Sequence, residues 1–335
     1  MNCCINCFND KFLSAIIEAK SHIKGKCGFC KIDNTLIINP KELNDYFQPL
    51  FSLYEISDEQ GKSIAELLKK DWVLFQTLSN NDTIKLLECI LEIELQDLFI
   101  PYKNTDEQKI LHWQNFKQEL KHDNRYFPKK APSYEHIKGL LQYLIVTTDN
   151  SMNLYRSRIN EDNKEINISE MGKPPAKKST AGRANPVGIP YLYTASNIKT
   201  AIAEIRPYKG DSLTIATFKI KSDLKLADLR DPRKSISPFE LDEDGLNQIF
   251  IDLDYLCHLG EELSKPILPR EAHLEYLSSQ YLCELIKHCG FDGVIYKSSV
   301  GDGDNYAIFS DDKLEAIETI VYSVNDIEII SNKIS

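Results

Sequence analysis

The 335-residue chain lacks the features that mark secreted, membrane-spanning and broadly nucleic-acid-binding proteins. Its opening residues, MNCCINCFNDK, contain no basic start followed by an apolar run, so we expect no secretory signal. No apolar stretch approaches the roughly 20 residues that a membrane-spanning helix needs. The formal net charge of −10 disfavours general affinity for nucleic acid or anionic membrane. The sequence therefore predicts a cytoplasmic globular protein with neither membrane nor nucleic acid as an expected partner.

A disulfide framework and paired histidines are missing as well. The nine cysteines are an odd number, and in a reducing compartment they do not indicate disulfides. The histidines between residues 43 and 145 are His112, His122 and His136, and their spacing matches neither a metal site nor a catalytic site. With 42% apolar residues, the chain is nevertheless long enough for two domains and a small appendage.

Four of the cysteines form two Cys-x2-Cys pairs near the N-terminus, separated by nineteen residues. Zinc prefers four soft ligands in a tetrahedron, and each pair offers two thiolates from one turn. The spacing therefore predicts a structural zinc site within residues 1–42, since four thiolates leave no position open for water. Cys3 is an alternative to Cys4 as a ligand. The alternative interpretation of the whole pattern is a set of unrelated buried cysteines. The predicted ligands are Cys4, Cys7, Cys27 and Cys30.

The rest of the chain changes character near residue 150. Between residues 43 and 149, apolar residues recur at helical spacing in stretches such as DTIKLLECILEIELQDLF, which predicts a helical domain. Within residues 150–335, β-branched and aromatic stretches alternate with Gly, Pro and Asp turns, and helices are expected at 196–206 and about 271–289. The predicted fold class is α+β, with this C-terminal domain preceded by a zinc knuckle and a helical domain.

Glu204 occupies a position that is unfavourable for a negative charge. It lies in the last turn of the helix expected at 196–206, where the helix dipole disfavours a negative charge. Helical spacing places it at the edge of the apolar stripe, beside the core. A site residue often violates local preferences in this way, whereas a solvated glutamate paired with Arg206 or Lys199 is the alternative interpretation.

The C-terminal half contains five motifs in this order: LYRSR (154–158), GRANPVGIPYLYTA (182–195), TAIAEIRP (200–207), GFDGVIYKSS (290–299) and GDGDNYAIF (301–309). Together they resemble the RES domain family, which is named for its Arg, Glu and Ser. The N-terminal half, with its paired cysteines before a helical segment, resembles the HEPN-like domain that precedes some RES domains. It lacks the ribonuclease motif of active HEPN domains, because Arg125 and His136 are eleven residues apart.

The resemblance implies an ADP-ribosyltransferase-like fold of two packed sheets that binds NAD and cleaves its nicotinamide–ribose bond. Water or phosphate would be the acceptor. Many family members are bacterial toxins, often neutralised by a small helix-turn-helix antitoxin, so an antitoxin or immunity partner is expected. An ADP-ribosyltransferase that modifies a protein or nucleic acid is the alternative. NAD is thus the expected substrate, and zinc the expected structural metal.

The motifs also imply roles for individual residues. A guanidinium fork suits the NAD phosphates, and a glutamate can stabilise an oxocarbenium-like state on the ribose. By motif, the expected catalytic residues are Arg156, Glu204 and Ser298, and the expected NAD-binding residues are Arg183, Tyr193, Tyr191 and Lys173.

Alternatives accompany several of these assignments. Of Tyr191 and Tyr193, one is expected to stack on the ligand while the other packs inside. Lys173 belongs to a lysine-rich loop that forms either a flap over the ligand or a solvated loop. Arg158 and Ser299 are the less favoured substitutes for the family's Arg and Ser.

Overall fold

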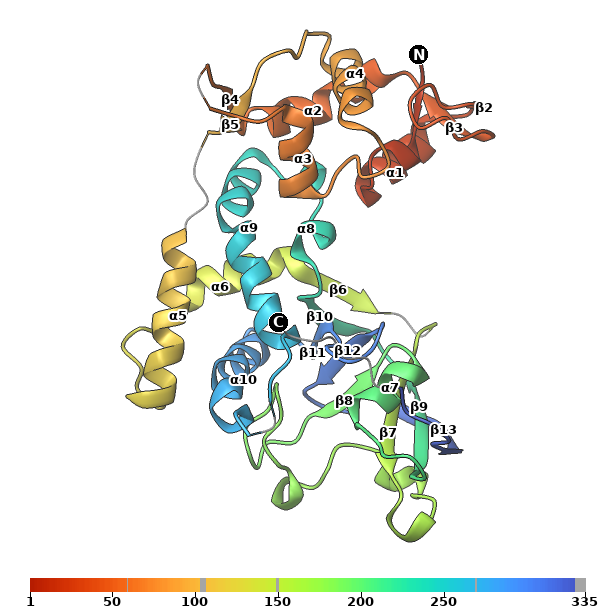
Figure 1. Cartoon of the computed structure of the whole chain (residues 1–335), viewed down its shortest axis with the longest axis vertical. Helices are drawn as coiled ribbons and strands as arrows, with labels where there is room; N and C mark the ends of the chain where they lie inside the picture. The colour runs from red at the N-terminus through yellow and green to blue at the C-terminus, as the bar shows by residue number, and fades with distance from the viewer. Residues whose placement is uncertain (59, 103–106, 149–150, 269, 329–335) are drawn as a thin grey trace, which may run out of the picture. The chain divides into compact units, whose positions relative to one another are not determined.

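The computed structural model describes residues 1–58, 60–102, 107–148, 151–268 and 270–328 (Figure 1). The chain forms two compact units, Met1–Glu107 with Asp231–Tyr255, and Gln108–Arg230 with Leu256–Ser335. Helix α9 (Glu243–Ser264) contributes residues to both. The finer division into segments 1–42, 43–149 and 150–335 stays a prediction. None of the helices within the described ranges is both long and apolar enough to span a bilayer.

The first unit begins with the cysteine-rich segment. Three short strands form an antiparallel sheet in the order β1-β3-β2. Asp10 begins the first helix, because its carboxylate accepts the N–H of Leu13 at 2.8 Å. The elements are β1 (Cys3–Cys4), η1 (Ile5–Cys7), α1 (Lys11–Lys20), β2 (Lys24–Gly25) and β3 (Thr35–Ile38).

The remainder of the first unit is mainly helical, and a two-stranded β4–β5 sheet accompanies the helices. The helix predicted from the pattern DTIKLLECILEIELQDLF is shorter than expected. It ends at Leu91 because Glu92 adopts a left-handed φ of 58°. The elements are η2 (Pro40–Leu43), α2 (Asn44–Phe51), β4 (Tyr54–Ile56), α3 (Ile64–Trp72), α4 (Asn80–Leu91), β5 (Phe99–Pro101), α8 (Pro232–Ser235) and η7 (Pro238–Glu240).

The second unit is built on an eight-stranded mixed sheet (Figure 1). The strand order is β13-β9-β7-β8-β12-β11-β10-β6, and only β10 and β11 are parallel neighbours among the described strands. The β-rich stretches predicted from the sequence are confirmed here. The strands are β6 (Ile145–Thr148), β7 (Asn153–Ile159), β8 (Leu192–Ala195), β9 (Ser212–Ile220), β10 (Leu224–Asp228), β11 (Gly293–Lys297), β12 (Asp304–Ile308) and β13 (Leu314–Ser323).

The sheet has a narrow junction between β7 and β8. These strands share one register pair, Tyr155 with Ala195, whereas β7 pairs with β9 from Asn153 to Ile159. We expected two packed sheets, and the described strands form one hydrogen-bonded order in which the single Tyr155–Ala195 pair joins the two halves. The mixed α+β class is confirmed, and the two-sheet, ADP-ribosyltransferase-like arrangement stays a prediction.

Helices of the second unit pack against this sheet. Helix α7 packs beside β7 and β8, and α10 packs on β11 (Figure 1). Gly290 follows α10 with a φ of 82°, a left-handed conformation that glycine favours at the end of a helix. The helices are α5 (Glu107–His122), α6 (Tyr134–Leu141), η3 (Gln142–Leu144), η4 (Glu161–Asn163), η5 (Ile168–Glu170), η6 (Ala176–Lys178), α7 (Ile198–Glu204) and α10 (Ala272–His288).

Candidate functional site

A cleft of about 460 Å³ lies in the second unit, where β7 and β8 meet. Its lining comes from these strands, from residues 182–183 and from parts of α7, α10 and β12. A volume of this size falls in the range of roughly 300–1,000 Å³ that is usual for small-ligand sites. Its charged lining consists of three arginines, Arg156, Arg183 and Arg206, and one carboxylate, Glu204.

Glu204 is the last residue of α7 and lies at the exposed rim of the cleft. Its Oε1 accepts one hydrogen bond from the Ser298 hydroxyl at 2.6 Å and another from the Asn305 Nδ2 at 2.6 Å. Among the described residues it pairs with neither Arg206 nor Lys199, and Lys199 instead lies 3.3 Å from Asp302. The ion pair of the alternative interpretation is therefore absent among the described residues, although the Glu204 side chain is exposed.

Helix α7 starts at Ile198, two residues later than the expected start at 196. The side chain of Asn197 caps it by accepting the N–H of Thr200 at 2.8 Å. Ser196 is occupied elsewhere, because its hydroxyl accepts the N–H of Asp304 at 2.9 Å. These contacts join the start of α7 to β12, and β12 also carries Asn305. Both ends of the helix are thus tied to the same strand.

Ser298 immediately follows β11 and holds a fixed position. Its hydroxyl accepts the N–H groups of Val300 at 3.2 Å and Gly301 at 2.9 Å while it donates to Glu204. Ser299 lines the cleft but has no such bond to the glutamate. Ser298 is not among the residues that line the cleft, but it contacts the glutamate that does, and its assignment as the family's Ser stays a prediction.

Arg156 lies on β7 with a desolvated guanidinium. Its Nη1 is buried and has no hydrogen-bond partner among the described residues. Burial, together with the nearby charge of Arg158, lowers the pKa of Arg156 to about 10, so the group stays cationic at neutral pH. Buried donors are nearly always paired, so an orphaned one facing a cleft indicates a missing acceptor. Arg158 donates to the carbonyl of Glu170 at 2.9 Å and does not line the cleft.

Arg183 borders the cleft and is held at several atoms. Its Nη1 donates to the carbonyl of Lys265 at 2.8 Å, and its Cζ lies 5.4 Å from the ring centre of Tyr276. Its own carbonyl accepts the Ser279 hydroxyl at 2.7 Å. The guanidinium keeps donors that are not used in these contacts, and these are available to an anionic ligand.

Tyr193 lies on β8, whereas Tyr191 immediately precedes that strand, and the two side chains have different surroundings. Tyr193 lines the cleft, and its hydroxyl accepts the N–H of Ala184 at 2.9 Å and donates to Asn185 at 2.7 Å. This tyrosine therefore fixes the loop that carries Arg183. Tyr191 is buried against Phe309, with ring centres 4.8 Å apart, and the structure places it outside the cleft lining.

Lys173 also lies outside the cleft lining. Its Nζ is 3.0 Å from Asp311, whose carboxylate also accepts the Lys173 backbone N–H at 3.2 Å. Partial burial raises the pKa of Asp311, but these contacts outweigh it and hold that pKa below its usual value. Lys173 is engaged by an ion pair and Tyr191 by core packing, and the predicted contacts of both residues with NAD stay predictions.

Two residues of the cleft were missed in the sequence. Asn305 is only 6% exposed and donates to Glu204, and an amide inside the apolar stretch NYAIF was the signal that could have identified it. Tyr276 lines the cleft from α10, but helical periodicity alone does not distinguish its ring from other half-buried aromatics.

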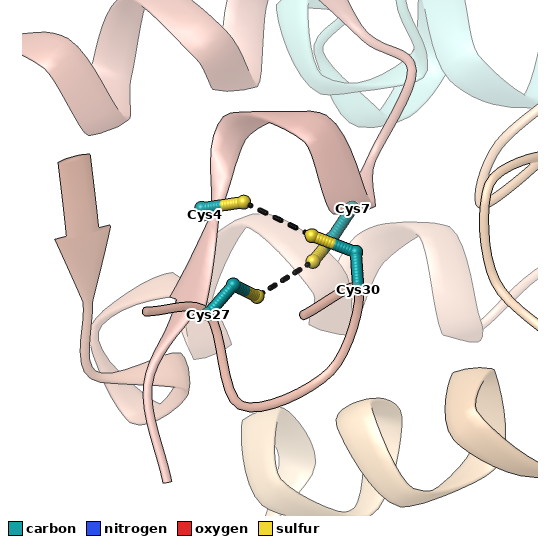
Figure 2. Close-up of side chains that lie close together, drawn as sticks. All are labelled: Cys4, Cys7, Cys27 and Cys30. Carbon is teal, nitrogen blue, oxygen red and sulfur yellow. Dashed lines mark hydrogen bonds between the residues drawn. The ribbon is translucent and has the colours of Figure 1, made fainter. Parts of the chain in front are cut away.

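A second candidate site, for a metal, lies in the first unit (Figure 2). The Sγ atoms of the four predicted ligands all lie within 4.8 Å of one another, and two of the Sγ pairs are 3.4 Å apart. Tetrahedral zinc with bonds near 2.3 Å separates its sulfur ligands by about 3.8 Å, so this donor set fits zinc. Cys3 is outside the cluster and points its thiol at the carbonyl of Ile38. The ligand candidates are Cys4, Cys7, Cys27 and Cys30.

The match to known protein families covers the part of the chain that lines the cleft. The family model described as the RES domain matches residues 153–328. The chain belongs to the RES domain family. Every residue expected from the RES motifs to be catalytic lies inside that range, and Glu204 and Ser298 are brought into contact. The HEPN-like assignment of the N-terminal half stays a prediction.

A solved structure also shows similarity to this RES protein. The crystal structure of the M. tuberculosis MbcT–MbcA toxin–antitoxin complex contains a chain 14% identical to it, with a TM-score of 0.33. The similarity covers 56% of the present chain and 93% of the other. No curated protein matches the chain.

Proposed function

We propose that this RES domain protein cleaves the nicotinamide–ribose bond of NAD, with water or phosphate as the acceptor. The observation that carries the proposal is the Glu204 carboxylate, held by Ser298 and Asn305 at the rim of a cleft that also contains the unpartnered Arg156 guanidinium. Family membership supports the same substrate, since the RES resemblance implies NAD. An ADP-ribosyltransferase-like classification of the sheet belongs to this proposal.

The three cleft arginines account for recognition of the dinucleotide. Two phosphates carry two negative charges, and guanidinium groups bind phosphate through parallel hydrogen bonds that an ammonium cannot reproduce. Arg156 supplies an orphaned buried donor, and Arg183 supplies a guanidinium fixed by Lys265 and Tyr276. Tyr276 also offers a half-buried ring on which a flat heterocycle can stack.

Glu204 accounts for the chemistry. When the bond from ribose C1′ to nicotinamide breaks, its electron pair stays on the nicotinamide nitrogen and positive charge develops on the sugar. A carboxylate beside the ribose stabilises that charge. Ser298 and Asn305 both donate to Oε1, which leaves Oε2 for a ribose hydroxyl. An oxygen of water or phosphate then bonds to C1′, and water loses a proton in the step.

Chromatography of the products from purified protein and NAD tests this proposal. We expect nicotinamide with ADP-ribose, or with a phosphate ester of ADP-ribose when phosphate is present. An ADP-ribosyltransferase would instead release nicotinamide only with cell extract and would transfer label from the adenine of NAD to a macromolecule. If all of these reactions lack both nicotinamide release and labelling, both functions are refuted.

We further propose that NAD consumption makes the protein a bacterial growth-inhibiting toxin or defence effector in the cytoplasm. An antitoxin or immunity protein is then the expected partner, because uncontrolled turnover would drain the shared NAD pool. Zinc bound by the cysteine cluster would stabilise the first unit and take no part in catalysis. The HEPN-like half would act as a regulator of the RES unit.

A further inference from the structure

Helix α5 lies upstream of the family match at residues 153–328, yet residues 108–122 belong to the same compact unit as the cleft. Two of its lysines, Lys117 and Lys121, are one turn apart and largely buried, with side chains 12% and 9% exposed. Lysine is seldom buried unless it is paired. Each of these two buried ammonium groups is therefore expected to have an acidic partner.

Both partners are glutamates of the RES region. The Lys117 Nζ lies 2.6 Å from Glu262, whose side chain is 3% exposed, and Lys121 pairs with Glu275. Lys265 connects the two pairs, because its Nζ is 3.4 Å from Glu262 and 3.6 Å from Glu275. Glu262 is on α9 and Glu275 is on α10. The lysines of α5 thus hold the end of one helix against the start of the next.

The charge state of this cluster follows from its contacts. Burial raises the pKa of Glu262, but the hydrogen bond from Lys117 and the charges of both nearby lysines outweigh it, so the net pKa is lowered. The hydrogen bond from Lys121 likewise lowers the pKa of Glu275. Removing Lys117 would leave a buried carboxylate without its shortest ion pair. The Lys265 ammonium would then be drawn more strongly toward Glu262.

The same segment holds Arg183. The carbonyl of Lys265 accepts the Arg183 guanidinium at 2.8 Å, while Tyr276 and Ser279 of α10 contact its guanidinium and its backbone carbonyl. A shift at residue 265 therefore changes the direction of the guanidinium in the cleft.

We infer that Lys117 and Lys121 are positioning residues for NAD binding, which act through Glu262, Glu275 and Lys265 on the Arg183 guanidinium. The inference rests on the proposed function, because it assigns that guanidinium to the NAD phosphates. A helix that lies outside the region matched by the family model would then support the substrate site from behind its lining. Neither lysine touches the ligand.

The test is the kinetics of Lys117→Met in the full chain. We expect the KM for NAD to rise about fivefold or more while kcat stays within about twofold, because ground-state orientation of a phosphate ligand is lost. Lys117→Arg keeps the charge and should restore much of the KM. Gln118→Met, an exposed neighbour on the same helix, is the matched control and should change neither constant. If Lys117→Met does not fold, Lys121→Met carries the same prediction.

A double-mutant cycle separates positioning from general stabilisation. In an Arg183→Lys background, Lys117→Met should raise KM no further, since both changes disable one group. Additive effects, or an unchanged KM in a folded Lys117→Met protein that still turns over NAD, would overturn the inference. Calorimetry with ADP-ribose distinguishes failure of this inference from failure of the proposed function. If the wild type binds ADP-ribose and Lys117→Met weakens that binding while neither consumes NAD, the proposed function fails and the inference stands.

Discussion

At the scale of single residues, the hydrogen bonds to Glu204 explain how a carboxylate is fixed at a helix end that disfavours negative charge. Ser298 and Asn305 supply donors to one oxygen of this carboxylate. The unfavourable interaction of the Glu204 charge with the helix dipole is thus offset by hydrogen bonds from two other parts of the chain. This arrangement leads to predictions that separate the two donors from their neighbours.

Ser298→Ala and Asn305→Ala should each lower kcat for nicotinamide release by about tenfold, with a smaller change in KM, because the carboxylate loses an orienting donor. Ser310→Ala is a matched control, since its hydroxyl bonds to the exposed Asp312 away from the cleft. Steady-state kinetics of wild type, these three variants and Ser299→Ala provide the comparison. A larger loss in Ser299→Ala than in Ser298→Ala would reassign the family's Ser.

Arg183→Lys should weaken NAD binding by about tenfold although the charge is kept, because an ammonium cannot form two parallel hydrogen bonds to phosphate. Arg158→Lys serves as the control, since Arg158 lies outside the cleft lining. Binding is measured by calorimetry in proteins that also carry Glu204→Gln, so that turnover is suppressed. Equal affinities for the two lysine variants would move the phosphate role to Arg156.

At the scale of elements, strands were easier to predict than the faces and ends of the elements. The stretch SLTIATFKI forms β9 as expected, because β-branched and aromatic residues express their preference locally. The end of α4 at Leu91 depended on the backbone of Glu92, and the position of Lys173 depended on an ion pair with Asp311 from a distant strand end. Such tertiary contacts have no signature in a single sequence.

In the cleft, residues within sequence motifs were predicted, whereas residues placed by packing were not. Motifs identified Glu204 and Ser298, and the structure brings them within hydrogen-bond distance. Tyr276 was missed because it comes from a helix outside the five motifs, and its place in the cleft depends on how α10 packs. The narrow junction between β7 and β8 also escaped prediction, since strand order is set by pairing across the whole sheet.

The zinc segment gives a prediction at this scale. The purified protein should contain about one equivalent of zinc, and Cys27→Ser should lose the metal and destabilise the first unit, because zinc–thiolate bonds contribute folding energy. Cys89→Ser changes a half-buried cysteine outside the cluster and should retain zinc. Elemental analysis and thermal unfolding provide the readouts. Freshly purified wild type without metal would disprove the site.

At the scale of the whole molecule, the proposed function predicts an effect on living cells. Expression in bacteria without an inhibitor should lower cellular NAD and slow growth, because one enzyme with turnover drains a pool that the cell shares. Expression of Glu204→Gln at an equal level is the control and should leave both unchanged. Normal NAD in cells that contain folded wild-type protein would count against a toxin.

The central claim is that the Glu204 carboxylate drives cleavage of NAD, and nicotinamide release by purified wild type and Glu204→Gln tests it most directly. The substitution keeps the shape and the hydrogen-bonding reach of the side chain but removes its charge. We predict that release falls by about 100-fold or more while the melting temperature is kept. Glu204→Gln protein that releases nicotinamide at the wild-type rate would contradict the account.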